Sequence, residues 1–154
     1  MGTEIERKYL VTDDSWRAGA KGTTMRQGYL HANAGLTVRV RTEGESAVLT
    51  IKKGIEGISR HEFEYEIPRD DAQFMLDNLC AGHIVEKTRH EVEFKGMTWE
   101  VDEFHGENAG LIVAEIELES EDQAFDRPPW LGQEVSDDPR YLNASLSRVP
   151  YSEW

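Results

Sequence analysis

Residues 60–67 read Arg60-His61-Glu62-Phe63-Glu64-Tyr65-Glu66-Ile67, so that an ionic side chain occupies every second position. A two-residue period is typical of a β-strand, because successive side chains of a strand point to opposite faces of the sheet. The same alternation runs through most of the chain. It predicts eight strands, at residues 3–11, 25–32, 36–43, 46–53, 59–67, 84–94, 97–105 and 110–119. Several of the links between them are short, so neighbouring strands are expected to be antiparallel.

Three other segments carry apolar residues at helical spacing instead. They lie at residues 13–17, 70–80 and 138–149. Each has an apolar stripe on one side, so we expect these helices to flank the sheet.

The alternating strands share an unusual property, which is that one face of the sheet is almost entirely ionic. The signs are also segregated, since some strands carry Glu-x-Glu and others carry Arg-x-Arg or Lys-x-Arg. An ordinary antiparallel sheet with one hydrated face is the simplest alternative, but such a face normally mixes in neutral polar residues. Opposed ionic rows are explained if the sheet closes and they meet across a lumen, and eight strands suffice for closure. We therefore predict an α+β, mainly antiparallel β fold: a closed eight-stranded β-barrel with flanking helices, formed by a single domain over residues 1–154.

Composition restricts the class of function. The chain has 154 residues and a formal net charge of −13, which disfavours binding to duplex nucleic acid or to an anionic membrane. Cys80 is the only cysteine, so neither an internal disulfide nor a cysteine-based zinc site can form. No apolar run approaches the ~20 residues of a membrane span, and the start of the chain is too charged for a signal peptide. We expect a cytoplasmic protein.

Carboxylates that face guanidinium and ammonium groups make a poor protein interior, because desolvation of each ion costs several kcal/mol. A ligand of both signs resolves this problem, with a divalent metal ion for the carboxylates and a polyphosphate for the cations. Hard oxygen ligands select Mg²⁺ or Mn²⁺, and Mg²⁺ commonly combines a few carboxylates with substrate phosphates. The pattern thus indicates metal-dependent phosphoryl transfer on a compact polyphosphate.

The first predicted strand contains Glu4-Ile5-Glu6-Arg7-Lys8, which resembles the ExExK signature of the CYTH superfamily, also called triphosphate tunnel metalloenzymes. Further matching positions follow in the same order along almost the whole chain: Arg39 and Arg41; Thr50 and Lys52; Arg60, Glu62 and Glu64; Lys87 and Arg89; Glu100 and Asp102; Glu115 and Glu117; and the segments Trp130-Leu131-Gly132-x-Glu134-Val135 and Arg140-Tyr141-x-Asn143. A lone ExExK would be a weak signal, whereas seven such motifs in the same order, each with its polar residues two apart, make chance a poor explanation.

The resemblance implies an eight-stranded tunnel that binds triphosphate together with divalent metal, here Mg²⁺ or Mn²⁺. It implies that the metal ligands come from Glu4, Glu6, Glu115 and Glu117, with Glu62, Glu64, Glu100 and Asp102 as weaker candidates. The cations that would hold the phosphates are Lys8, Arg39, Arg41, Lys52, Arg60, Lys87 and Arg89. The compact form resembles the bacterial inorganic triphosphatase group, in which positions matching Lys8 and Tyr29 are proposed to activate water. Neighbouring cations and carboxylates act in opposite directions on the pKa of Lys8, so the sequence leaves that direction open.

The leading functional hypothesis is hydrolysis of inorganic triphosphate to pyrophosphate and phosphate. Hydrolysis of thiamine triphosphate or another organic triphosphate is the first alternative, followed by class IV adenylate cyclase activity. A polyphosphate-binding module without catalysis is the alternative from another class. A homodimer also stays open, because three short helices need not cover the whole outward apolar face of the sheet.

Overall fold

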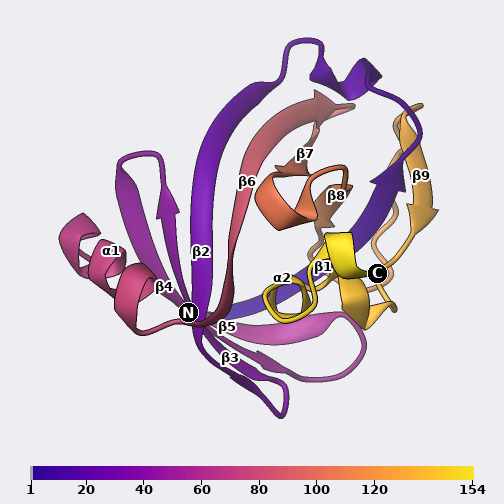
Figure 1. Ribbon diagram of the computed structural model, residues 1–154. Coiled ribbons are helices and arrows are strands. Elements are labelled where there is room, and N and C mark those ends of the chain that lie inside the picture. Colours follow the sequence, from indigo (N-terminus) through magenta and orange to yellow (C-terminus); the bar gives the residue numbers. More distant parts are fainter. Residues whose placement is uncertain (1) are drawn as a thin grey trace.

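Eight antiparallel strands close on themselves in the computed structural model, which describes residues 2–154 (Figure 1). The strands are β1 (Gly2–Val11), β2 (Lys21–Asn33), β3 (Leu36–Glu43), β4 (Ser46–Gly54), β5 (Ser59–Glu66), β6 (Ala81–Phe94), β7 (Met97–Phe104) and β8 (Ile112–Glu117). They are hydrogen-bonded in the order β5-β4-β3-β2-β6-β7-β8-β1, and β1 pairs back with β5 to complete the ring. The predicted eight-stranded barrel is confirmed.

The first strand closes the barrel by dividing its length between two partners. Residues 2–5 of β1 pair with β5, and residues 6–10 pair with β8. A ninth, short strand, β9 (Leu131–Glu134), pairs with the end of β1 beside this junction. The sequence analysis missed β9, because four residues are too few to reveal an alternating pattern.

The helices partly match their predictions. A 3₁₀ turn, η1 (Ser15–Arg17), and α1 (Arg69–Asn78) lie in the first two predicted segments. The prediction of one helix over residues 138–149 is wrong, because Leu142 is extended (φ −66°, ψ 136°) and divides the segment. This separates η3 (Pro139–Tyr141) from α2 (Asn143–Leu146), and two further 3₁₀ turns are η2 (Gly106–Asn108) and η4 (Tyr151–Glu153). None of the helices within residues 2–154 is both long enough and apolar enough to cross a membrane.

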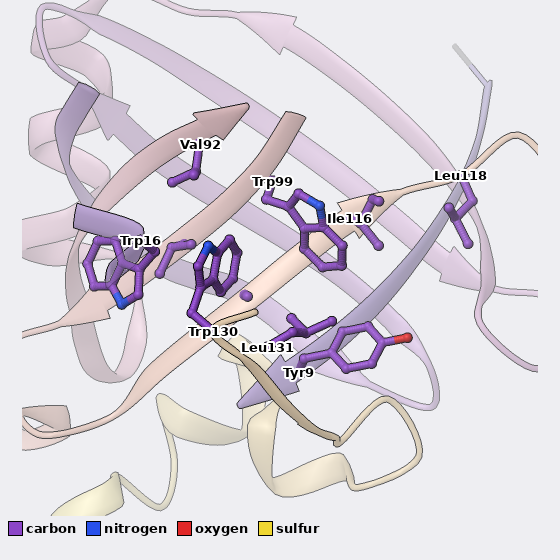
Figure 2. Close-up of a cluster of buried hydrophobic side chains, with 10 residues drawn as sticks. Tyr9, Trp16, Val92, Trp99, Ile116, Leu118, Trp130 and Leu131 are labelled. Carbon is purple, nitrogen blue, oxygen red and sulfur yellow. The ribbon is translucent and has the colours of Figure 1, made fainter. Parts of the chain in front are cut away.

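The apolar sides of the strands face outward and are covered in three places. Helix α1 packs over β3 and β4, where Ala72 and Leu76 contact Val40 and Ala47. The C-terminal segment, from η3 to η4, covers another part of the barrel. Its Leu146 belongs to a second, separate apolar cluster. The third and largest cluster lies on β1 and β6 to β8, together with side chains of the loops around them (Figure 2). The hydrophobic core therefore surrounds the barrel, and the lumen is left to the ionic side chains.

Trp99 lies at the centre of the largest cluster. It is fully buried, and its ring meets those of Tyr9, Phe125 and Trp130 edge-to-face at centroid distances of 5.8, 5.6 and 5.8 Å. Edge-to-face pairs at this distance add to the stabilisation that burial already gives. The aromatic cluster thus holds the β1–β8 side of the barrel together from the outside.

We expect Trp99→Ala to lower the free energy of unfolding by about 3–5 kcal/mol, because it removes a large buried ring and leaves a cavity. Urea denaturation followed by circular dichroism measures this change. Phe74→Ala on α1 is the control, because Phe74 is 60% exposed and its loss should change stability by less than about 0.5 kcal/mol. A similar, small effect of both substitutions would contradict the assignment of Trp99 to the core.

Candidate active site

The barrel encloses a cavity of about 420 Å³. Of the sixteen residues predicted for the site, fifteen border it: Glu4, Glu6, Lys8, Tyr29, Arg39, Arg41, Lys52, Arg60, Glu62, Glu64, Lys87, Arg89, Glu100, Glu115 and Glu117. The remaining residue of the prediction, Asp102, does not.

Strand register explains why these side chains converge. Lys8 on β1 lies opposite Glu115 on β8, and Glu6 lies opposite Glu117. On the other side of the ring, Arg39 on β3 lies opposite both Tyr29 on β2 and Thr50 on β4. Residues directly opposite each other in a sheet point to the same face. When one of these side chains points into the barrel, its partners on the neighbouring strands therefore point inward too.

Three carboxylates gather on the β1–β8 side of the cavity, and we call them the carboxylate triad: Glu4, Glu6 and Glu117. One oxygen from each lies within 4.8 Å of the others. Burial raises the pKa of Glu117, and the charges of Glu4 and Glu6 raise it further. Burial also raises the pKa of Glu6, as does the charge of Glu115. This crowding of negative charge, with hard oxygen donors, is the chemistry that a divalent Mg²⁺ or Mn²⁺ ion fits.

Glu115 differs from Glu117 because two protein cations contact it. Lys8 Nζ lies 3.2 Å from one of its oxygens, and Arg89 Nη2 lies 3.0 Å from the other. Burial alone would raise the pKa of Glu115, but the charges of Lys8 and Arg89 hold it well below its usual range. Glu62 and Glu64 likewise contact protein cations, at 3.5 Å from Lys52 and 3.9 Å from Arg39.

Asp102 lies beneath the cavity wall and not on it. Its two oxygens accept hydrogen bonds at 2.8 Å from Lys87 Nζ and from Arg89 Nε and Nη2, and its side chain is completely buried. Arg89 is opposite Asp102 in the β6–β7 register, which places the carboxylate under the guanidinium. In contrast to the prediction, the structure thus brings Asp102 to two cations that line the cavity and not to the cavity itself.

Two arginines of β3 also border the cavity. We call Arg39 and Arg41 the arginine pair, and the Nε atom of each is buried without a hydrogen-bond partner among residues 2–154. Burial lowers the pKa of Arg41, and the charges of Arg39 and Arg89 lower it further. Arg41 also pairs with Glu43 at the end of the strand. Buried guanidinium donors without acceptors are costly, and an anion in the cavity would satisfy them.

Two lysines connect the halves of the site. Lys52 Nζ lies 2.9 Å from Glu4 and 3.5 Å from Glu62. Lys8 Nζ lies 3.2 Å from Glu115 and 3.6 Å from Glu6. Burial lowers the pKa of Lys8, but the charges of Glu115 and Glu6 outweigh it, so the net pKa is raised above the usual range. The structure thereby gives the direction that the sequence left open.

Two neutral residues of the site were not among the predicted site residues. Gln27 on β2 is completely buried, and Asn143 at the start of α2 borders the cavity, where its Oδ1 accepts a hydrogen bond from Lys87. Gln27 could have been found, because it has the same strand parity as Tyr29. Asn143 belongs to the matching segment Arg140-Tyr141-x-Asn143, but that match assigned it no role, and its place in the cavity depends on the break of the helix at Leu142.

A closed antiparallel barrel whose cavity is lined by carboxylates and cations defines the class of this protein: a tunnel domain built around a charged ligand. Residues 2–150 match the CYTH domain, and the chain belongs to the CYTH family. It is 48% identical over 154 residues to an inorganic triphosphatase of Acetivibrio thermocellus, a match that covers 100% of this chain and 99% of that protein.

A second relative, an inorganic triphosphatase of Nitrosomonas europaea, is 40% identical over 153 residues, which covers 94% of this chain and 97% of the relative. Among solved structures, that of the inorganic triphosphatase NE1496 superposes with a TM-score of 0.66 at 36% identity. The superposition covers 93% of this chain and 96% of that one.

Proposed function

We propose that this protein hydrolyses inorganic triphosphate to pyrophosphate and phosphate with a divalent metal ion, Mg²⁺ or Mn²⁺. The observation that carries the proposal is the separation of charge across the cavity. In the closed ring of eight strands, β8 with Glu117 and β3 with the arginine pair are four strands apart and therefore on opposite sides. A ligand in between must present anionic groups to one wall and a cation to the other, and a metal–triphosphate complex does both.

The arginine pair and its neighbours would hold the phosphates. Arg39 has a long contact to Thr50, 3.4 Å, and one to Glu64 at 3.9 Å, so its guanidinium is weakly engaged. Arg60 makes no ion pair within residues 2–154, although it borders the cavity. Guanidinium groups bind phosphoryl oxygens through paired, charge-assisted hydrogen bonds. These side chains therefore position the substrate chain along the β3 and β5 walls.

The carboxylate triad would hold the metal ion, with Glu115 close by on the same wall. When bound, the ion would supply charge neutralisation at the phosphoryl oxygens and polarisation of the phosphorus centre. Glu62 and Glu64 border the cavity beside protein cations and would keep Lys52 and Arg39 in place. Asp102 would likewise hold two cations in place, Lys87 and Arg89, from beneath the cavity wall.

Lys8 and Tyr29 are the proposed catalytic residues. Lys8 carries its ammonium between Glu6 and Glu115 and can donate a hydrogen bond to the attacking water or to a phosphoryl oxygen. Tyr29 is buried on β2 and borders the cavity near the arginine pair. Each group is held by its strand, so neither requires reorganisation when the substrate enters.

The cavity lining favours an inorganic substrate over an organic one. Apart from Tyr29, its apolar side chains are Leu142 and Ala144, both from the C-terminal segment. A thiazole or adenine ring would need an apolar or aromatic shelf, and the lining provides none among residues 2–154. The names of the two relatives agree with this choice.

The test is phosphate release from inorganic triphosphate, thiamine triphosphate and ATP, each with Mg²⁺, Mn²⁺ or excess chelator. We expect turnover that is strongest with inorganic triphosphate and that disappears with chelator. A preference for thiamine triphosphate would overturn the choice of substrate, and cyclic AMP formed from ATP would indicate a cyclase. Triphosphate binding by calorimetry without turnover on any substrate would indicate a binding module.

Three broader predictions stay predictions. They are a single domain over residues 1–154, a cytoplasmic location, and a homodimer as an open alternative to the monomer. Exposed apolar side chains such as Tyr65 and Phe74 lie on the outer surface, where a second copy could bind.

A further inference from the structure

A short line of hydrogen bonds joins Lys87 to Tyr29 through two neutral amides. Lys87 Nζ lies 3.0 Å from Asn143 Oδ1, and the same oxygen lies 3.1 Å from Gln27 Nε2. Gln27 Nε2 in turn lies 3.4 Å from the Tyr29 hydroxyl oxygen, a long hydrogen bond. The line thus begins at a buried cation and ends at a hydroxyl that borders the cavity.

The cation fixes the direction of every bond in this line. An ammonium group only donates, so the Asn143 atom that faces Lys87 must be its carbonyl oxygen. That oxygen can only accept, so the Gln27 atom that faces it must be the amide nitrogen. The same nitrogen faces Tyr29 and donates to it, so the hydroxyl oxygen of Tyr29 is an acceptor within the protein. The tyrosine proton cannot point at Gln27, and the Tyr29 hydroxyl donates no hydrogen bond within residues 2–154.

A second observation supports this direction. Gln27 Oε1 is buried and has no hydrogen-bond partner among residues 2–154, although reversal of the amide would let this oxygen accept from the Tyr29 hydroxyl. The reversal does not occur because it would place two carbonyl oxygens, those of Gln27 and Asn143, against each other. An unsatisfied buried oxygen is unfavourable, so the contact with Asn143 dominates the orientation of Gln27.

We propose that Asn143 and Gln27 are positioning residues that turn the Tyr29 hydroxyl proton into the cavity, toward a phosphoryl oxygen of the bound triphosphate. This inference rests on the proposed function. Burial lowers the pKa of Lys87 to about 7 against the charge of Asp102, and a polyanion in the cavity keeps Lys87 charged while substrate is bound. Lys87 therefore acts on Tyr29 from a distance, without contact between the two.

Two substitutions of matched charge test the direction of the hydrogen bonds between Lys87 and Tyr29. Gln27→Glu and Asn143→Asp each add one carboxylate to the same network at nearly constant shape. Glutamate at position 27 can only accept, so it draws the Tyr29 proton away from the cavity, and we expect kcat to fall by about 10–100-fold with little change in KM. Aspartate at position 143 still accepts from both neighbours and preserves the direction, so its loss of kcat should be about tenfold smaller.

A double-substitution cycle with Tyr29→Phe separates positioning from a structural role. Without the hydroxyl, Gln27→Glu should change kcat by less than about twofold, because its effect passes through Tyr29. Equal losses from the two charged variants, or an undiminished effect of Gln27→Glu when it is combined with Tyr29→Phe, would overturn the inference. Wild-type protein without turnover would instead overturn the proposed function, and the inference with it.

Thermal unfolding of each variant shows whether it has folded. If Gln27→Glu does not fold, Asn143→Leu replaces it in the same cycle, because it removes the acceptor that orients Gln27 and leaves Gln27 itself intact. We expect a loss of kcat of about tenfold that disappears with Tyr29→Phe. A loss that persists in the absence of the hydroxyl would count against the proposal.

Discussion

Glu117→Gln should lower metal-dependent turnover of triphosphate by about 100-fold or more, the largest catalytic effect that we expect from one substitution. Loss of a residue that merely orients a metal ligand commonly costs 10–100-fold, and Glu117 is proposed as a ligand itself. Glu117 forms no ion pair within residues 2–154, unlike Glu4, which pairs with Lys52. The substitution therefore removes one member of the carboxylate triad without releasing a protein cation.

Steady-state rates at a series of Mg²⁺ and Mn²⁺ concentrations measure this effect, and the half-saturating metal concentration should rise. Glu119→Gln is the matched control, because Glu119 has the same parity two residues further along the chain, is exposed and does not border the cavity. Its rate should equal that of the wild type. If Glu117→Gln keeps more than about half of the activity with unchanged metal dependence, the metal site lies elsewhere.

Asp102→Asn should lower the free energy of unfolding by about 3–5 kcal/mol, a loss as large as that expected from removal of the buried Trp99 ring. Removal of one partner from a buried ionic group leaves the other charges uncompensated, here those of Lys87 and Arg89. An asparagine oxygen can accept from one of these cations, but its amide group then opposes the other. Denaturant unfolding in the presence of excess chelator measures the change.

The chelator makes this experiment decisive for the role of Asp102. A residue that only bound metal would leave the metal-free protein unchanged or more stable when neutralised, whereas a residue that supports two cations would destabilise it. Asp14→Asn is the control, since its side chain is 72% exposed and lies 3.5 Å from Arg17, and we expect no measurable change. An equally small effect at Asp102 would contradict the supporting role.

Much of the barrel could be predicted because strand parity is a local property. The ionic row of β5 is visible in residues 60–66 alone, and short links fix its neighbours as antiparallel. Closure of the sheet could also be predicted from the sequence. Carboxylates on some strands and cations on others compensate each other if the strands face one another across a lumen. The segregation of sign along each strand was thus the informative feature, more than the hydrophobic pattern.

What escaped prediction depends on interactions between distant segments. The division of β1 between β5 and β8 cannot be recognised from its own residues. Asp102 has the parity of a lumen residue, yet Lys87 and Arg89 cover it, and no periodicity indicates that depth. Asn143 reaches the cavity only because Leu142 is extended, and the apolar spacing of residues 138–149 favoured a continuous helix.

The split pairing of β1 has a consequence for the order in which the protein is made. Among the eight barrel strands, β1 is synthesised first, and both of its neighbours come later, around residue 60 and around residue 115. Contacts so far apart in sequence form slowly, and nascent chains begin to fold from the N-terminus. Strand β1 therefore has no complete set of strand partners until most of the chain has been synthesised. Since Glu4 and Glu6 meet Glu117 only at that moment, a truncated chain that stops short of β8 would lack not one ligand but the whole binding site.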